Sequence, residues 1–171
     1  MVEITPITPK DIVSFHRTLD FVARERRYLS FSEAPPLEST RAFVLDMIAH
    51  GYPQLVARSG GEVVGWCDVT PKSGPIDARI GILGMGLLPQ FRHQGIGSQL
   101  MVRALADARA FGFSRVELTV YRSNANAIRL YEKAGFVIKA VQPAAAPGDA
   151  VDKTVLIMAL SLETPAGERP R

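Results

Sequence analysis

A glycine-rich loop before a helical pattern has the residue types and spacing of an anion-binding site. It reads Arg92-His93-Gln94-Gly95-Ile96-Gly97-Ser98. The first N–H groups of a helix have no partner within the helix, and the helix dipole places partial positive charge behind them. Glycines let a phosphate approach the backbone, and Arg92 adds positive charge at the rim. An ordinary tight turn between a strand and a helix would contain the same glycines.

Two other phosphate-binding loops do not fit this segment. A Walker A loop places lysine and then serine or threonine after its last glycine, and the run Gly95-Ile96-Gly97-Ser98 has no lysine. A dinucleotide-binding fingerprint has three glycines in the pattern G-x-G-x-x-G, and position 100 is leucine.

A second segment narrows the choice of ligand. Asn124 precedes a helical pattern that ends in Leu130-Tyr131 and is followed by Gly135-Phe136. Together with the Arg92 loop, this segment resembles the two signatures of the GNAT superfamily of N-acetyltransferases: Arg/Gln-x-x-Gly-x-Gly/Ala, and an asparagine followed by Leu-Tyr-x-x-x-Gly-Phe. The resemblance is sharp over residues 79–136 and extends only in outline to the first 75 residues. Within the superfamily, the loop from Tyr28 to Pro36 is similar to loops of the branch that resembles phosphinothricin acetyltransferases.

The resemblance implies acetyl-CoA as the acetyl donor. Backbone amides from His93 to Ser98 would hold the pyrophosphate, and the strand from Met85 to Leu87 would bond the pantetheine arm as a neighbouring strand does. The N–H of Leu87 would face the thioester oxygen and stabilise the oxyanion. The residues expected to contact acetyl-CoA are Met85, Gly86, Leu87, Arg92, His93, Gln94, Gly95, Ile96, Gly97, Ser98, Asn124 and Tyr131.

Tyr131 occupies the position where many members of the superfamily place a general acid near the CoA sulfur. Ordinary pKa values of about 10 for tyrosine and about 8.5 for a thiol make full proton transfer to the thiolate uphill. A hydrogen bond to the developing thiolate is the safer expectation, and a ring that only fills the core is the alternative. Asn124 would contact the cofactor arm or cap its own helix. Asn126 is a weaker candidate for a contact with the cofactor.

No carboxylate occupies residues 80–88, where many relatives carry a glutamate as general base. An amine with a pKa of about 10.4 loses its proton at pH 7 at a cost of about 4.6 kcal/mol. Glu33, in the loop after the first helix, is a candidate base close to the expected acceptor site. Glu117 and Asp68 are alternative candidates. A carboxylate in any of these three positions is more often solvated or structural than catalytic.

The elements that position these residues follow from apolar periodicity and chain breakers. The sequence predicts an α/β fold in the order β-α-α-β-β-β-α-β-α-β-β. The resemblance implies a mixed, mostly antiparallel sheet of the GNAT type, with a central splay for acetyl-CoA. Expected strands cover 2–7, 53–58, 62–69, 78–88, 115–121, 136–141 and 151–160, and expected helices cover 11–29, 38–48, 95–112 and 124–133. Gly81, Gly84 and Gly86 lie inside one strand pattern, where they mark a bulge or the close approach of a ligand.

Composition limits the classes of protein that fit. The 171 residues, 47% of them hydrophobic, suit one domain over 1–162 with a flexible tail at 163–171. Apolar runs are too short to span a bilayer, no secretory signal is visible, and Cys67 is the single cysteine. A cytoplasmic location without membrane attachment is the simplest expectation, with Cys67 as a small core residue.

The distribution of charge and the spacing of histidines argue against a nucleic-acid-binding protein and against a metalloprotein. The net charge of +3 comes from basic residues spread along the chain, so nucleic acid is not an expected partner. The cluster Arg24, Arg26 and Arg27 is either a phosphate-binding patch or a solvated helix face. His16, His50 and His93 show no metal-ligand spacing, so no metal is expected.

The reaction implied is direct acetyl transfer to the amine of a small molecule or amino acid. The loop Tyr28–Pro36 would lie over the acceptor, and its aromatic residues with one acid suit such a substrate. A protein N-terminal or lysine acetyltransferase and a non-catalytic acetyl-CoA-binding module stay open as alternatives. A homodimer through the exposed final strands is also consistent with the sequence.

Overall fold

The computed structural model describes residues 1–74, 79–143 and 152–163. One seven-stranded sheet has the order β1-β2-β3-β4-β5-β7-β6. The strands are β1 (Val2–Pro6), β2 (Gln54–Ser59), β3 (Glu62–Pro71), β4 (Ile80–Leu87), β5 (Arg115–Tyr121), β6 (Val137–Gln142) and β7 (Val155–Ser161). The helices are α1 (Ile12–Arg24), α2 (Leu37–His50), α3 (Ile96–Phe111) and α4 (Ala125–Lys133), with short 3-10 helices at Pro9–Asp11 and Pro89–Phe91. This order confirms the predicted mixed α/β fold.

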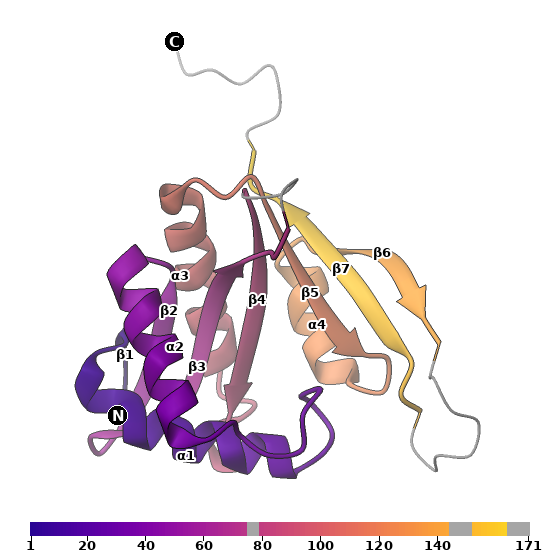
Figure 1. Ribbon diagram of the computed structural model, residues 1–171. Helices are drawn as coiled ribbons and strands as arrows, with labels where there is room; N and C mark the ends of the chain where they lie inside the picture. The colour runs from indigo at the N-terminus through magenta and orange to yellow at the C-terminus, as the bar shows by residue number, and fades with distance from the viewer. Residues whose placement is uncertain (75–78, 144–151, 164–171) are drawn as a thin grey trace.

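A pair of helices covers each face of the sheet (Figure 1). Helices α1 and α2 lie in front of the sheet in this view, where Phe15 packs edge-on against Trp66 with 5.8 Å between ring centroids. Helix α3 packs on the opposite face, where Leu100 and Leu118 belong to one buried cluster. Because the sheet is buried on both faces, its central strands present different residues to two separate layers.

Helix α1 ends at Arg24, earlier than the predicted end near Leu29. Arg26 has a φ of 55°, in the left-handed region, and its N–H donates to the carbonyl of Ala23 at 3.0 Å. A residue in this conformation closes a helix in the way that glycine usually does. Tyr28 and Leu29, which continued the apolar pattern of the sequence, therefore line a cavity instead of a helix face.

The glycines of β4 have packing explanations that the sequence pattern did not identify. A Cβ atom on Gly86 would lie 2.4 Å from Cη2 of Trp66, and one on Gly81 would lie 2.3 Å from Cγ1 of Val69. Neighbouring side chains of β3 thus occupy the space that larger residues would need. Packing against β3 therefore explains the glycines at these two positions without a bulge or a closely approaching ligand.

Several predicted boundaries of strands and of the C-terminal tail differ from the structure or lie outside the described residues. Strand β7 begins at Val155, and residues 152–154 are not strand. The predicted strand start at Val151, most of the loop before it and the tail at 164–171 lie outside the described residues.

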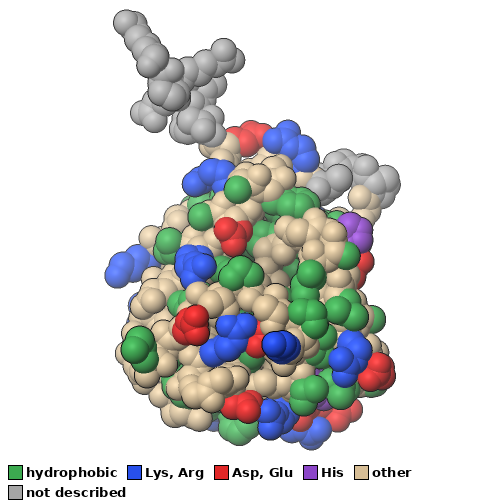
Figure 2. All heavy atoms as spheres, turned by 90° about the vertical axis from the view of Figure 1, so that its left-hand side faces the viewer, with side chains coloured by type: hydrophobic (Ala, Val, Ile, Leu, Met, Phe, Trp, Pro, Cys, Tyr) green, Lys and Arg blue, Asp and Glu red, His purple; other side chains and the backbone are tan. Residues whose placement is uncertain are grey.

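Basic and acidic side chains alternate on the face shown in Figure 2, with hydrophobic side chains between them. They form no continuous basic surface on that face. Within the described ranges, no helix is long and apolar enough to cross a membrane.

Candidate active site

Strands β4 and β5 separate in the middle of the sheet. Their parallel pairing joins only residues 80–82 of β4 to residues 115–117 of β5. Beyond Ile82, β4 continues along β3 to Leu87 without a strand on its other side (Figure 1). The sheet therefore opens into a splay whose edge is formed by the second half of β4.

Backbone polar groups of β4 point into this splay. The N–H of Leu88 donates to the carbonyl of Val64 at 2.9 Å, which continues the antiparallel register of β3 and β4. In such a ladder, alternate residues turn their N–H and C=O toward the partner strand. Because Leu88 faces β3, Leu87 and Met85 face the opposite direction, toward the splay.

The loop that follows β4 presents unpaired N–H groups at one end of the splay. Helix α3 begins after Gly95, and no side chain caps it. The N–H groups of residues 93–98 donate to no acceptor in the part of the chain that the structure describes. His93 and Gly95 have φ values of 60° and 80°, and left-handed residues next to ordinary ones turn successive N–H groups toward one point. These six groups at a helix N-terminus form a cradle for an anion.

Gly97 allows this cradle to pack on β4. A Cβ atom there would lie 3.4 Å from Cε of Met85 and 3.5 Å from Cδ1 of Leu87. The first turn of α3 and the splay edge of β4 are therefore in direct contact. Ile96 contributes only its backbone, because its side chain is buried, and the side chain of Gln94 donates to the carbonyl of Gln90 at 2.8 Å.

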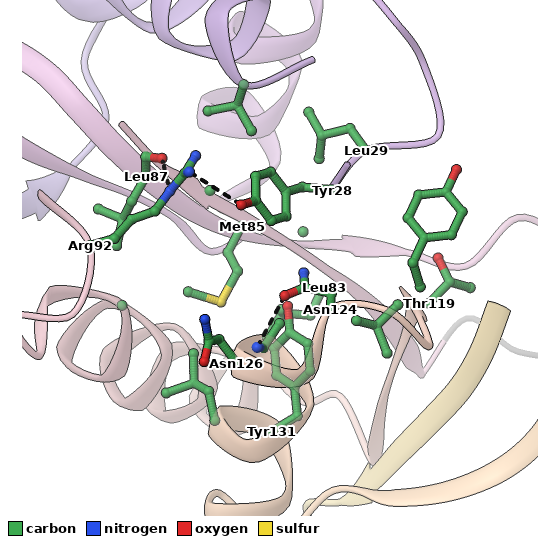
Figure 3. Close-up of a pocket in the computed structure, with 18 of the residues that line it drawn as sticks. Tyr28, Leu29, Leu83, Met85, Leu87, Arg92, Thr119, Asn124, Asn126 and Tyr131 are labelled. Carbon is green, nitrogen blue, oxygen red and sulfur yellow. Dashed lines mark hydrogen bonds between the residues drawn. The ribbon is translucent and has the colours of Figure 1, made fainter. Parts of the chain in front are cut away.

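Arg92 turns away from the cradle toward the loop after α1. Its guanidinium donates to both carboxylate oxygens of Glu25, at 3.1 and 2.6 Å, and lies 4.6 Å from the ring centroid of Tyr28. Its Nε donates to the carbonyl of Leu87 at 2.9 Å (Figure 3). The expected charge at the rim is therefore already paired, and Arg92 instead ties the loop after α1 to the end of β4.

Two adjoining cavities open at the splay. The first, of about 420 Å³, lies between the splay edge of β4, the cradle, the start of α4 and the loop after α1. The second, of about 830 Å³, lies between the loop after α1, the turn from β5 into α4 and the residues before β7. Tyr28, Leu29, Phe31 and Tyr121 line both cavities, so the two are adjacent.

Tyr131 and Asn124 enter the first cavity from α4 and its N-terminus (Figure 3). The Asn124 side chain accepts from the N–H of Ala127 at 3.3 Å, so it caps its helix as well as lining the cavity. Tyr131 is 7% exposed, and burial raises its pKa well above the ordinary value. The phenol is therefore a neutral hydrogen-bond donor and a poor source of a free proton.

None of the three candidate bases lines either cavity, and two of them are held in ion pairs. Glu33 is largely exposed and pairs with Arg24 at 3.4 Å, so the structure does not bring it to the site. Glu117 accepts hydrogen bonds from Arg115 at 2.8 Å and from Lys72 at 3.1 Å. These two bonds hold its pKa below the ordinary value, although partial burial acts in the opposite direction. A carboxylate in two ion pairs is a weak base.

Asp68 differs from both. It is buried in β3 opposite Gly84, and its carboxylate forms no hydrogen bond or ion pair within the described residues. Burial raises the pKa of Asp68 to about 7. A Cβ atom on Gly84 would lie 3.3 Å from Oδ1 of Asp68, and Gly84 lines the first cavity. The missing side chain at Gly84 thus leaves the carboxylate next to the cavity wall.

The remaining polar candidates are structural. Cys67 is fully buried in the α3 layer, where burial raises the pKa of its thiol, so a thiolate is disfavoured. His16 contacts the carbonyl of Pro35 at 2.8 Å, and His50 stacks on Tyr52. Within residues 1–74, 79–143 and 152–163, no group of three or more His, Cys, Asp and Glu side chains is arranged to hold a metal ion.

Solved acetyltransferases superpose on nearly the whole chain. The acetyltransferase of the GNAT family from Streptococcus pneumoniae gives a TM-score of 0.84 at 26% identity, over 94% of this chain and 99% of that one. A phosphinothricin acetyltransferase from Sinorhizobium meliloti in complex with AcCoA gives 0.87 at 17% identity, over 99% and 93% of the two chains. The splayed sheet and the cradle therefore belong to the acetyltransferase class of folds.

Sequence comparison identifies the family. The family model described as Acetyltransferase (GNAT) family matches residues 19–136, and the chain belongs to this family. L-amino acid N-acetyltransferase AaaT of Escherichia coli (strain K12) is 32% identical over 90 residues, which cover 52% of this chain and 56% of that protein. Across the curated relatives, the matched stretch covers between 26% and 56% of their lengths.

Proposed function

We propose that this chain transfers an acetyl group from acetyl-CoA directly to the amine of a small molecule or amino acid. The observation that carries the proposal is the continuity of two backbone features. Free N–H and C=O groups along β4 lead directly to six free N–H groups at the start of α3. A ligand with amides along an arm and a pyrophosphate at its end matches both.

The residues present fit acetyl-CoA as the donor substrate. The cradle from His93 to Ser98 would hold the pyrophosphate, and Met85 and Leu87 would bond the amides of the pantetheine arm. Acetyl-CoA supplies an activated thioester carbonyl. The N–H of Leu87 would donate to the carbonyl oxygen as it becomes negative, and removal of one such donor costs about 2.7–4 kcal/mol in other enzymes.

Proton removal from the acceptor is assigned to Asp68. Its carboxylate is buried next to Gly84, and Gly84 lines the first cavity. A base with a pKa near 7 accepts a proton at neutral pH and releases it again, which suits general-base catalysis. Glu33 is exposed and paired with Arg24, and Glu117 is paired with Lys72 and Arg115, so neither is a buried, unpaired carboxylate.

Tyr131 is proposed to donate a hydrogen bond to the departing thiolate. Replacing Tyr131 with phenylalanine removes the hydroxyl and keeps the ring, which packs against Phe136 with 5.8 Å between centroids. Turnover should fall by about tenfold or more, because a hydrogen bond to a charged group contributes roughly 1.5–3 kcal/mol. Affinity for acetyl-CoA should change little. Steady-state rates and calorimetric titration test both expectations, and an unchanged rate would remove Tyr131 from the mechanism.

Free thiol release tests the proposed function. The purified chain is incubated with acetyl-CoA and a panel of amines and amino acids while thiol formation is followed. Acceptor-dependent release, with the acetylated product confirmed by mass spectrometry, supports the proposal. Tight acetyl-CoA binding without acceptor-dependent release would support a non-catalytic binding module, and acetylation of peptides alone would support a protein acetyltransferase.

Two further expectations accompany this proposal. Strand β6 is at the edge of the sheet and exposes Val137, Ile138 and Val141 by 51%, 48% and 55%. An uncovered edge strand with apolar side chains favours pairing with a second copy of this chain, and sedimentation of the chain with and without Val141→Lys would test this. A cytoplasmic location stays a prediction from the sequence.

A further inference from the structure

We propose that Arg26 and Arg27 form a subsite for an anionic group of the acceptor, so that the preferred substrate is an α-amino acid whose carboxylate they bind. The inference rests on the proposed acetyl transfer and names the class of its acceptor. Its basis is the charge distribution of the second cavity, which joins the donor site through shared walls.

The acidic residues of this cavity are already neutralised. Glu25 accepts two hydrogen bonds from Arg92, and Asp152 accepts from Nη2 of Arg122 at 2.7 Å. Arg26 and Arg27 also line the cavity, and neither guanidinium has a hydrogen bond or ion pair in the described part of the chain. Two guanidinium groups without counter-charges beside paired carboxylates make the cavity attractive to an anion.

The backbone conformation at Arg26 supports a binding role for its side chain. Arg26 occupies the position after the end of α1 with a φ of 55°, a conformation in which glycine is favoured over residues with a Cβ. Arginine is thus a poorer choice than glycine for closing the helix. Its side chain contributes charge to the cavity, which glycine would not.

The rest of the cavity suits the other parts of an amino acid. Leu29, Phe31 and Tyr121 line both cavities and offer apolar contacts to a side chain of the substrate. An α-amino acid held by its carboxylate at Arg26 and Arg27 would direct its amine inward toward Gly84 and the donor. A planar carboxylate matches the bidentate geometry of a guanidinium group.

Transfer at this position balances without further reactants. The ammonium of the amino acid gives one proton to Asp68, and the neutral nitrogen attacks the thioester carbonyl carbon. A C–N bond forms, the C–S bond breaks, and the electron pair leaves with sulfur as the thiolate. The nitrogen then loses a second proton, which passes to the sulfur and gives the CoA thiol. The hydrogen bond from Tyr131 stabilises the thiolate until it is protonated.

Matched acceptors that differ in one group test the subsite. Rates are measured for L-phenylalanine, L-methionine and L-leucine and for the corresponding amino alcohols, which keep the amine and side chain but lose the carboxylate. The unaltered chain should prefer each amino acid at least tenfold in kcat/KM. Arg26→Gly and Arg27→Gln should each reduce kcat/KM for the amino acids about tenfold or more, with little change for the alcohols.

Stability separates this effect from misfolding. Arg26→Gly should keep or raise the melting temperature, because glycine relieves the left-handed backbone. Arg17→Ala is the matched control, since Arg17 is exposed on α1 and pairs with Glu62 away from both cavities. Equal rates for amino acids and alcohols, or unaltered selectivity in both variants, would overturn the subsite and leave acetyl transfer standing. Absence of thiol release with every amine would overturn the proposed function itself.

Discussion

Replacing Asp68 with asparagine is expected to lower turnover at least 100-fold and, at pH 8, to stabilise the folded chain. Both effects have the same cause, a carboxylate that is buried without a partner. Asparagine keeps the shape of the side chain, carries no charge and cannot accept the proton of the acceptor. Loss of a general base typically lowers rates by ~10²–10⁴-fold.

The direction of the stability change follows from the pKa of Asp68. Burial raises it from 3.8 to about 7, so between these pH values the folded state binds more protons than the unfolded state. Stability is therefore fully present below about pH 4 and declines as the pH rises to 7. A shift of about three pKa units corresponds to roughly 4 kcal/mol at pH 8. Asp68→Asn should recover most of this amount at pH 8 and progressively less at lower pH.

Urea denaturation at pH 5.5 and pH 8, together with the pH dependence of kcat/KM, measures these effects. The rate of the unaltered chain should rise with pH through about 7, and the variant should lack this rise. Asp107→Asn, an exposed substitution on α3, serves as the control and should change neither quantity. Full activity in Asp68→Asn, or equal stabilisation at both pH values, would contradict the assignment.

Gly84→Ala tests the same carboxylate from the cavity side. Its methyl group would lie 3.3 Å from Oδ1 of Asp68, at a residue that lines the first cavity. Turnover should fall, whereas the stabilisation at pH 8 seen with Asp68→Asn should be absent because the charge is retained. A variant that lost activity only through misfolding would show a lower unfolding midpoint at both pH values.

Replacing Ser98 with aspartate is expected to weaken acetyl-CoA binding by more than 100-fold without destabilising the chain. Ser98 is exposed in the first turn of α3, where an acidic side chain interacts favourably with the helix dipole by about 0.3–1 kcal/mol. The same carboxylate would compete with the pyrophosphate for the free N–H groups and repel its charge. Like charges placed together at an interface cost several kcal/mol, and each 1.4 kcal/mol is a factor of ten in affinity.

Ser98→Asn separates charge from size in this experiment, because asparagine has nearly the shape of aspartate. Calorimetric titration of both variants with acetyl-CoA should show a large loss only for aspartate, with melting temperatures equal to or above that of the unaltered chain. If both variants bound acetyl-CoA equally well, the cradle would not be the pyrophosphate site.

The order of the elements was predictable because its signals are local. Apolar periodicity defined nearly every strand and helix, and the glycines around position 96 indicated where the backbone leaves N–H groups free. The end of α1 was placed too late, since Tyr28 and Leu29 continue its apolar pattern. Their true location depends on the left-handed backbone at Arg26, a position where the sequence shows no glycine.

The amino-acid sequence by itself indicated the anion cradle at the start of α3, because glycines before a helix start create that geometry locally. The role of the β4 edge was expected only from the resemblance to the GNAT superfamily. The tertiary structure alone decided which side chains are available for chemistry. Glu33, Asp68 and Glu117 all carry a carboxylate, and only packing leaves that of Asp68 buried and unpaired. Likewise, Arg92 meets Glu25 across 67 positions of the chain, so its charge is already paired. Burial and pairing arise from contacts between distant segments, which local sequence patterns do not contain.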